Sequence, residues 1–197
     1  MKKALLFFIP CTFLFLPAWV RAQAPPPENQ RWIEQADGGF VFPLSPGVAQ
    51  EYARGVGGDI LVGYRFNRDF NLSADVGYFE CDEKFYGGAS GSWTYDPLLL
   101  LARFNFGPGW VRPFLLLGAG LAVDSYSLTT SYEGQVSNRE TDPMLSPGAG
   151  VLFIVETNVA IYLQTRVDLI FSRVGGPWTD NPTVFLPIKA GLSVLTF

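Results

Sequence analysis

Two long apolar runs joined by a Gly-Pro-Gly turn are the feature that most restricts the fold of this chain. They span Leu98–Asp124, with Gly107-Pro108-Gly109 between them. Each run is shorter than the about 20 apolar residues that a membrane-spanning helix needs, and the proline and glycines of the second run disfavour a helix. Read with a period of two, one phase is apolar throughout, whereas the other contains Arg103, Arg112 and Asp124. Strands of about ten residues with one apolar face are typical of a β-hairpin that crosses a lipid bilayer.

The same alternation recurs along the chain in further segments: Gly38–Leu44, Gly57–Phe66, Phe70–Phe79, Leu145–Val155, Val159–Phe171 and Val184–Phe197. With the central hairpin, these segments make eight strands. Three-residue turns alternate with long connections at Ser45–Gly55, Glu80–Pro97, Ser125–Met144 and Ser172–Thr183. The first half of Ser125–Met144 could continue its strand beyond the membrane. The pattern predicts an all-β fold, an eight-stranded antiparallel up-and-down transmembrane β-barrel, with short periplasmic turns and longer external loops.

The charged residues of these segments test the prediction independently, because the phases are defined by apolar residues alone. All of them fall on the less apolar phase: Asp59, Arg65, Asp75, Arg103, Arg112, Asp124, Arg166, Asp168 and Lys189. A lipid-facing arginine or lysine would cost roughly 2–4 kcal/mol at the bilayer midplane. We therefore expect these residues to form a structural ion network inside the barrel, where acids and bases neutralise one another. Aromatic residues beside the short turns predict an interfacial girdle: Tyr64, Phe66, Phe70, Phe104, Phe106 and Trp110.

The N-terminus has the pattern of a secretory signal peptide. Lys2 and Lys3 precede an apolar stretch, and small residues follow, so that residues 1–22 are expected to be removed after Ala22, with cleavage after Ala24 as the alternative. Residues 23–37 are then a polar periplasmic tail, and residues 38–197 are the barrel domain. Removing Lys2, Lys3 and Arg21 from the 14 basic residues leaves 11 against 18 acidic residues. This balance argues against nucleic acid as a partner.

A soluble barrel with the apolar phase inside, such as a lipocalin-like calyx, is the main alternative fold. Its outer face should be rich in lysine, glutamate, serine and threonine. The second phase of this chain instead holds glycine, leucine and phenylalanine along with the charges. Cys81 would be the one cysteine of the processed chain, and it is interpreted as an unpaired loop residue in preference to an intermolecular disulfide.

The sequence resembles the small eight-stranded outer-membrane barrels, namely the OmpA-type transmembrane domain and its OmpX-like relatives. The resemblance rests on VGYRF at Val62–Phe66, on FLLLGAGLAV at Phe114–Val123, and on the terminal Phe197. It implies a location in the cell outer membrane, contact with outer-membrane lipids, and insertion by the barrel-assembly machinery, which would read Phe197 as the assembly signal. Phe197 departs from the usual pattern because it shares a phase with Lys189.

We expect a non-enzymatic barrel, a monomer, with a structural role or a surface-interaction role carried by its external loops. No catalytic or metal-ligating residues and no cofactor are predicted; the chain contains no histidine, which removes the commonest general base and transition-metal ligand. Two alternatives stay open. One is a lipid-modifying outer-membrane enzyme, although barrels of that kind pair a histidine with a serine. The other is a narrow small-solute channel, although the inward charges should fill the lumen.

Overall fold

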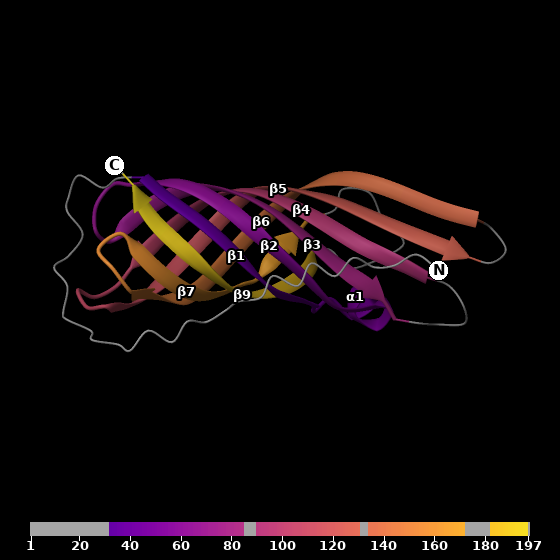
Figure 1. Cartoon of the computed structure of the whole chain (residues 1–197). Helices are drawn as coiled ribbons and strands as arrows, with labels where there is room; N and C mark the ends of the chain where they lie inside the picture. The colour runs from indigo at the N-terminus through magenta and orange to yellow at the C-terminus, as the bar shows by residue number, and fades with distance from the viewer. Residues whose placement is uncertain (1–31, 85–89, 131–133, 172–181, 197) are drawn as a thin grey trace.

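In the computed structural model the chain forms one closed antiparallel sheet (Figure 1). The structure describes residues 32–84, 90–130, 134–171 and 182–196. The strands are β1 (Trp32–Pro43), β2 (Tyr52–Arg65), β3 (Phe70–Glu83), β4 (Ser90–Asn105), β5 (Val111–Thr130), β6 (Gly134–Ile154), β7 (Val159–Arg166), β8 (Asp168–Ile170) and β9 (Thr183–Thr196). Neighbours in the chain pair with each other, and β9 closes the barrel by pairing with β1. Because β8 continues β7 between β6 and β9, the architecture is the predicted eight-stranded up-and-down barrel.

The break between β7 and β8 falls at Val167, where both neighbouring strands carry a proline. Pro147 lies on β6 and Pro187 on β9. Proline has no backbone N–H and cannot donate to a neighbouring strand. The Val167 N–H still donates to the Pro147 carbonyl at 2.8 Å. The hydrogen bond to β6 keeps the barrel closed here, whereas the two prolines, which cannot donate, interrupt the strand.

The outside of the barrel is apolar around its circumference. Side chains that are mostly exposed there include Ile60, Val62, Val76, Leu98, Leu100, Leu115, Leu117, Leu163 and Leu192. A barrel in water would bury these residues, so the soluble-barrel alternative is wrong. In a bilayer the closed sheet also satisfies the backbone hydrogen bonds that lipid cannot.

Aromatic side chains gather at the end of the barrel that carries the three short turns. Trp32, Tyr64, Phe66, Phe70 and Phe104 form a chain of ring contacts, with successive centroids 5.6, 5.1, 5.5 and 4.9 Å apart. Aromatic rings prefer the boundary between lipid and water. This end of the barrel therefore has the interfacial girdle that the sequence predicts.

The first strand is longer than the sequence predicts. β1 begins at Trp32, so Trp32–Asp37 belongs to the barrel rather than to a tail. This segment pairs with β2 on one side and with β9 on the other, from Trp32↔Tyr64 and Trp32↔Thr196 onward. Two pairing partners stabilise an extended conformation that the polar sequence of this segment does not suggest by itself. The predicted signal peptide, the remainder of the tail and Phe197 lie outside the described residues.

The predicted loop Ser45–Gly55 contains a short helix, α1 (Pro46–Glu51), followed directly by β2. Pro46 favours the first helical position because its fixed φ suits a helix and its missing N–H would have no partner there. The Ser45 Oγ accepts a hydrogen bond from the Val184 N–H at 2.8 Å, which ties the start of α1 to β9. Within the described part of the chain, no helix is long and apolar enough to cross a membrane.

The two long external connections are largely strand. β3 continues to Glu83 and β4 begins at Ser90, while β5 continues to Thr130 and β6 begins at Gly134. The expected continuation of the strand into the first half of Ser125–Met144 is confirmed, and the second half pairs with it in β6. These residues are rich in serine, threonine and tyrosine, which can pair as strands in water without an apolar face. Hydrophobic alternation does not detect such strands. The predicted loop 172–183 lies mainly outside the described residues.

Candidate functional site: charged groups inside the barrel

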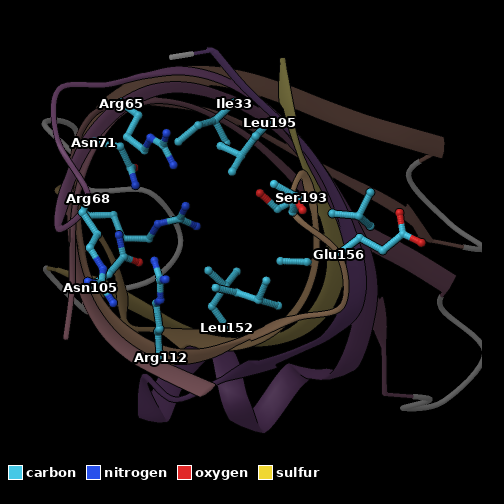
Figure 2. Close-up of a pocket in the computed structure, with 15 residues that line it drawn as sticks. Ile33, Arg65, Arg68, Asn71, Asn105, Arg112, Leu152, Glu156, Ser193 and Leu195 are labelled. Carbon is cyan, nitrogen blue, oxygen red and sulfur yellow. The ribbon is translucent and has the colours of Figure 1, made fainter. Parts of the chain in front are cut away.

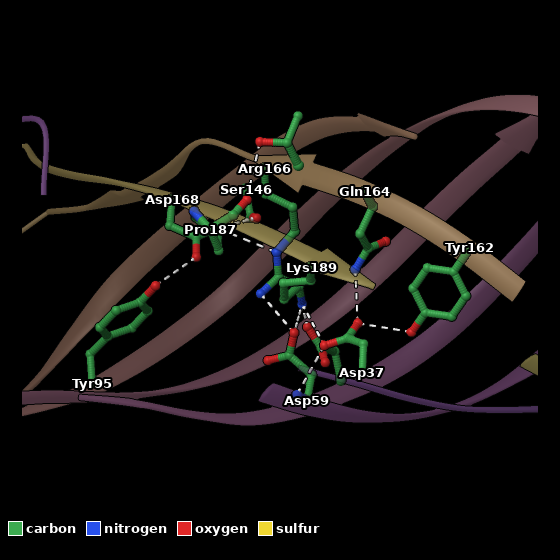
Figure 3. Close-up of polar contacts among 12 residues, drawn as sticks. Asp37, Asp59, Tyr95, Ser146, Tyr162, Gln164, Arg166, Asp168, Pro187 and Lys189 are labelled. Carbon is green, nitrogen blue, oxygen red and sulfur yellow. Dashed lines mark hydrogen bonds and ion pairs between the residues drawn. The ribbon is translucent and has the colours of Figure 1, made fainter. Parts of the chain in front are cut away.

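The middle of the barrel contains an ion cluster centred on Arg166 (Figure 3). Its guanidinium lies 3.2 Å from Asp59, 2.5 Å from Asp75 and 3.6 Å from Asp168, measured between nitrogen and carboxylate oxygen. All four side chains are fully buried. Arg166 is the last residue of β7, whereas Asp59 and Asp75 lie on β2 and β3. The planar guanidinium can reach several carboxylates at once, so it links separate walls of the barrel.

Lys189 on β9 adds a second cation to the cluster. Its ammonium group lies 3.2 Å from the Asp37 carboxylate and also contacts Asp59. Asp59 therefore bridges Arg166 and Lys189. With Asp37 included, four carboxylates share two cations, so the cluster is acid-rich.

Neutral donors stabilise the excess of carboxylates. The Tyr95 hydroxyl donates to Asp168 at 3.2 Å and the Ser146 hydroxyl at 2.5 Å. Asp37 accepts from the Tyr162 hydroxyl at 2.8 Å and from the Gln164 amide at 3.0 Å. Hydrogen bonds to a charged group are stronger than neutral ones, and a buried carboxylate needs several of them.

Gly77 on β3 makes room for this cluster. A β-carbon at Gly77 would collide with the carboxylate of Asp59, and it would lie 2.9 Å from the Pro97 side chain. Asp59 cannot move aside without losing its cations. The glycine is therefore required by the packing of the ion cluster.

The arginines near the short turns form a separate group. Arg65, Arg103 and Arg112, together with Arg68 of the first short turn, line a pocket at that end of the lumen. Figure 2 shows Arg65, Arg68 and Arg112 on one wall, with Ile33, Leu152 and Leu195 among the residues on the remaining walls. The pocket has a cavity volume of about 40 Å³.

Asp124 lies toward the opposite end of the barrel, on β5. It is buried, and its Oδ1 has no hydrogen-bond partner among the described residues. Asp142 of β6, which pairs in register with Ala122, is buried nearby. Among the described residues, no ion pair joins Asp124 to a basic side chain.

The structure thus places all of the predicted inward charges inside the barrel, with Arg65 half-buried, but it does not join them into one network. Asp59, Asp75, Arg166, Asp168 and Lys189 come together, whereas Arg65, Arg103 and Arg112 lie near the turns and Asp124 near the far rim. The expectation of a single network over the whole set is corrected, because only five of the nine residues lie at the level of the ion cluster. Asp37, which the sequence predicts in the tail, also belongs to the cluster. Its inward position follows from the structure, in which Ile33 and Gln35 on the same face of β1 are buried.

Aromatic rings fill the lumen on the far side of the ion cluster. Tyr95 stacks on Phe79 and Phe185 with centroids 4.9 and 4.7 Å apart, and Trp93 contacts Phe185 and Tyr52. These rings are buried. Together with the fully buried ion cluster, they leave a lumen packed with side chains, which is the expected interior of an eight-stranded barrel.

The described residues show no arrangement typical of a metal site, since no group of three or more cysteine, aspartate or glutamate side chains could hold a metal ion. Ser146 donates to Asp168 but is completely buried. A lipid acyl chain could not reach its hydroxyl in this conformation.

Comparisons with solved structures identify the architecture. The barrel matches the Neisserial surface protein A with a TM-score of 0.61 and 21% identity, over 83% of this chain and 96% of the other. The fold is that of the small eight-stranded outer-membrane β-barrels. A major outer-membrane protein of Thermus thermophilus matches with a TM-score of 0.60 and 13% identity, over 84% of this chain and 98% of the other. The attachment invasion locus protein Ail of Yersinia pestis matches with a TM-score of 0.54 and 15% identity, over 85% and 99%.

No protein-family model and no curated protein sequence matches the chain. The likeness is therefore one of architecture. The apolar outer band, the aromatic girdle and the closed sheet are suited to the same location as these barrels, the outer membrane.

Proposed function

We propose that this protein is a non-enzymatic outer-membrane barrel that binds partners at the cell surface through the strands that project beyond its rim. The observation that carries the proposal is the length of the β5–β6 hairpin. Its register runs without a break from Val111↔Phe153 to Thr130↔Gly134. β7 and β8 pair only with the part of β6 from Met144 to Ile154. Residues 134–143 therefore extend beyond that pairing, about 30 Å of strand at roughly 3.4 Å per residue.

The projection is a sheet of several strands. β4 pairs with β5 as far as Ser90↔Thr129, and β3 pairs with β4 as far as Asp82↔Ser92 (Figure 1). A paired sheet is stiffer than a free loop, so it presents its side chains with little conformational entropy to lose on binding. Binding residues are commonly placed at the end of such a rigid scaffold.

The packed lumen favours this function over the two alternatives. Arg166, Tyr95 and Phe185 are completely buried across the middle of the barrel, which supports a solid scaffold rather than a solute channel. The absence of histidine from the sequence and the burial of Ser146 favour a non-enzymatic role over lipid modification. We propose outer-membrane lipids and the barrel-assembly machinery as its partners, and we propose that the barrel acts as a monomer.

The charge of the external segments indicates what kind of ligand to test. In sequence, acidic residues outnumber basic ones in the long external connections, even when the buried Asp142 is left out: Glu51, Glu80, Asp82, Glu83, Asp96, Glu133, Glu140 and Asp180 against Arg54, Lys84, Arg139 and Arg173. Ail has been solved in complex with the heparin analogue sucrose octasulfate. An acidic rim repels such a polyanion, so we propose a protein ligand with a basic surface for this barrel.

The test compares the intact protein with a variant in which residues 128–136 are replaced by a short turn. Both proteins are placed in lipid nanodiscs, and binding to immobilised fibronectin, laminin, collagen and heparin is measured by interferometry. We expect the intact barrel to bind at least one of the three proteins and the shortened variant to lose that binding by at least about tenfold. Heparin should bind neither.

A deletion of matched length within residues 172–181 is the control for a general effect of removing external residues. The shift in gel mobility on boiling shows that each variant still folds as a barrel. Absence of binding by the intact protein, or equal binding by the 128–136 variant, would contradict the proposed role of the hairpin.

A further inference from the structure

The pocket at the short-turn end of the lumen is built for an anion. We propose that it binds a phosphate-class oxyanion, held between the guanidinium groups of Arg103 and Arg112. This site lies at the opposite end of the barrel from the projecting hairpin, so the inference is independent of the proposed surface function.

The partners of Arg103 are all neutral. Its guanidinium donates to the side-chain amide oxygen (Oε1) of Gln35 at 3.2 Å and lies 5.2 Å from the centre of the Phe114 ring. When the amide of Asn71 is turned so that its oxygen faces Arg103, that oxygen accepts from Nε and Nη2 at 3.1 and 3.2 Å. Among the described residues no carboxylate lies within ion-pair distance of Arg103, although the side chain is buried, its exposed fraction being 7%.

Arg112 is in the same situation. It is buried, with an exposed fraction of 5%, and its Nε donates to the Gly109 carbonyl at 3.0 Å. In the part of the chain that the structure describes, no carboxylate is within ion-pair distance of it. Arg65 and Arg68 lie close enough to repel its charge. Concentrating cations in a partly buried space is unfavourable unless a counter-charge is present.

The acids nearest to the pocket do not supply that counter-charge. Asp69 attracts Arg112 from the first short turn, and Glu156 lines the edge of the pocket. Both carboxylates are exposed. Figure 2 places Glu156 across the opening from Arg65 and Arg112. Exposed charges are well hydrated and screened, so they compensate buried arginines only weakly.

The shape and volume of the pocket indicate the size of the ligand. A cavity of about 40 Å³ has room for roughly three water molecules at 10–15 Å³ each, which suits a single oxyanion group, so that the rest of a larger phosphate ester would lie outside the pocket. Arginine is the side chain best matched to such a group, because its planar fork can donate two parallel hydrogen bonds to phosphate oxygens. The pocket lies beside the short turns, which face the periplasm in this topology. Its ligand is therefore free phosphate or the phosphate of a lipid headgroup.

The experiment measures binding to the full protein in lipid-free dodecyl maltoside micelles. Sodium phosphate and dihexanoyl phosphatidylglycerol are titrated separately by calorimetry, against sodium chloride at matched ionic strength. The chloride reference is essential because salt alone reduces the repulsion among the arginines. Arg112→Gln at the pocket and Arg54→Gln on the exposed surface at the other end of β2 are the test and control variants.

We expect at least one of the two phosphate ligands to bind the intact protein and the Arg54→Gln variant equally, and to bind Arg112→Gln about 10- to 100-fold more weakly, the loss expected for a charge-assisted pair of hydrogen bonds. Binding of inorganic phosphate identifies the free ion as a sufficient ligand. Binding of the lipid alone identifies the headgroup. Arg103→Gln is measured in the same way where the gel-mobility shift shows that it folds.

Two results would contradict the proposed anion site. One is that neither ligand binds more tightly than chloride. The other is that Arg112→Gln binds as well as Arg54→Gln does. Binding that both variants weaken equally is attraction to the overall charge of the protein and also contradicts a built site.

Discussion

The acid-rich ion cluster predicts an asymmetry between removing a base and removing an acid. Arg166 contacts Asp59, Asp75 and Asp168 in a fully buried space, and Lys189 is the other cation there among the described residues. Replacing Arg166 with glutamine leaves these carboxylates facing one another. Removing one partner of a buried ion pair typically costs about 3–5 kcal/mol, which is a large part of the roughly 5–15 kcal/mol by which a domain is stable.

Replacing Asp75 with asparagine acts in the opposite direction. It removes one negative charge from a cluster in which carboxylates exceed cations, and the amide oxygen can still accept from the Arg166 guanidinium. The lost strength of one charged hydrogen bond is offset by reduced repulsion among the remaining carboxylates. We therefore expect a loss of about 1 kcal/mol for Asp75→Asn, well below the loss for Arg166→Gln.

Equilibrium urea unfolding in lipid vesicles measures both values, with tryptophan fluorescence and the gel-mobility shift as separate probes. Arg166→Lys keeps the positive charge but loses the planar guanidinium, so its loss of unfolding free energy should fall between those of the two variants. Arg139→Gln, at an exposed position, should stay within about 0.5 kcal/mol of the unmodified protein. If Asp75→Asn destabilises the barrel as much as Arg166→Gln does, the cluster is not acid-rich in the folded protein and the reasoning fails.

Three further predictions concern packing, lipid contact and accessibility. Gly77→Val should lower the free energy of unfolding by about 1–3 kcal/mol, because its side chain collides with the Asp59 carboxylate. A β-carbon alone already causes this collision, so a Gly77→Ala variant as stable as the unmodified protein would contradict this packing. Leu117→Arg, on the lipid-facing side of β5, should cost roughly 2–4 kcal/mol in vesicle unfolding, whereas Thr141→Arg beyond the apolar band should cost little; equal losses would place the membrane elsewhere. Cys81 should react with a maleimide only after unfolding in urea, since its thiol is buried, and rapid labelling of the folded barrel would show that this part of the lumen opens.

The strands that contact lipid could be predicted from the sequence because the bilayer imposes a strict alternation. Segments such as Phe70–Phe79 and Val111–Val123 face lipid on one side, so an apolar residue at every second position is required. The strand extensions of β5 and β6 beyond the membrane face water on the outside, and no such requirement acts on them. Pairing with a neighbouring strand holds them extended, and that pairing depends on the register of the whole sheet.

Asp37 illustrates the same limit inside the barrel. The residues around it are polar, and a short polar segment after a proline-rich stretch has no local signal for a strand. It becomes a strand because β9 returns from the far end of the sequence to pair with it, at Asp37↔Gly191. Closure of the barrel is a long-range event, and the contacts of Asp37 with Lys189 and Tyr162 follow from closure.

Alternation shows which charges point inward but not how high along the barrel they lie, and the height decides which charges can pair. Height can be read from the number of residues that separate a charge from the nearest short turn. Arg65, Arg103 and Arg112 lie within about four residues of such a turn, Asp75 and Arg166 about six to eight residues away, and Asp124 about fifteen. In the β3–β4 pairing Arg103 lies opposite Asn71, four positions from Asp75, which is roughly 14 Å at 3.4 Å per residue. Asp124 lies about seven residues further from its turn than Arg166 does, so both separations exceed the reach of an ion pair. Charge balance must therefore be counted level by level, because an acid at one height does not neutralise an arginine at another. Counted in this way over the described residues, the level next to the short turns holds Arg103 and Arg112 without a buried carboxylate, which is the imbalance that a bound oxyanion would correct.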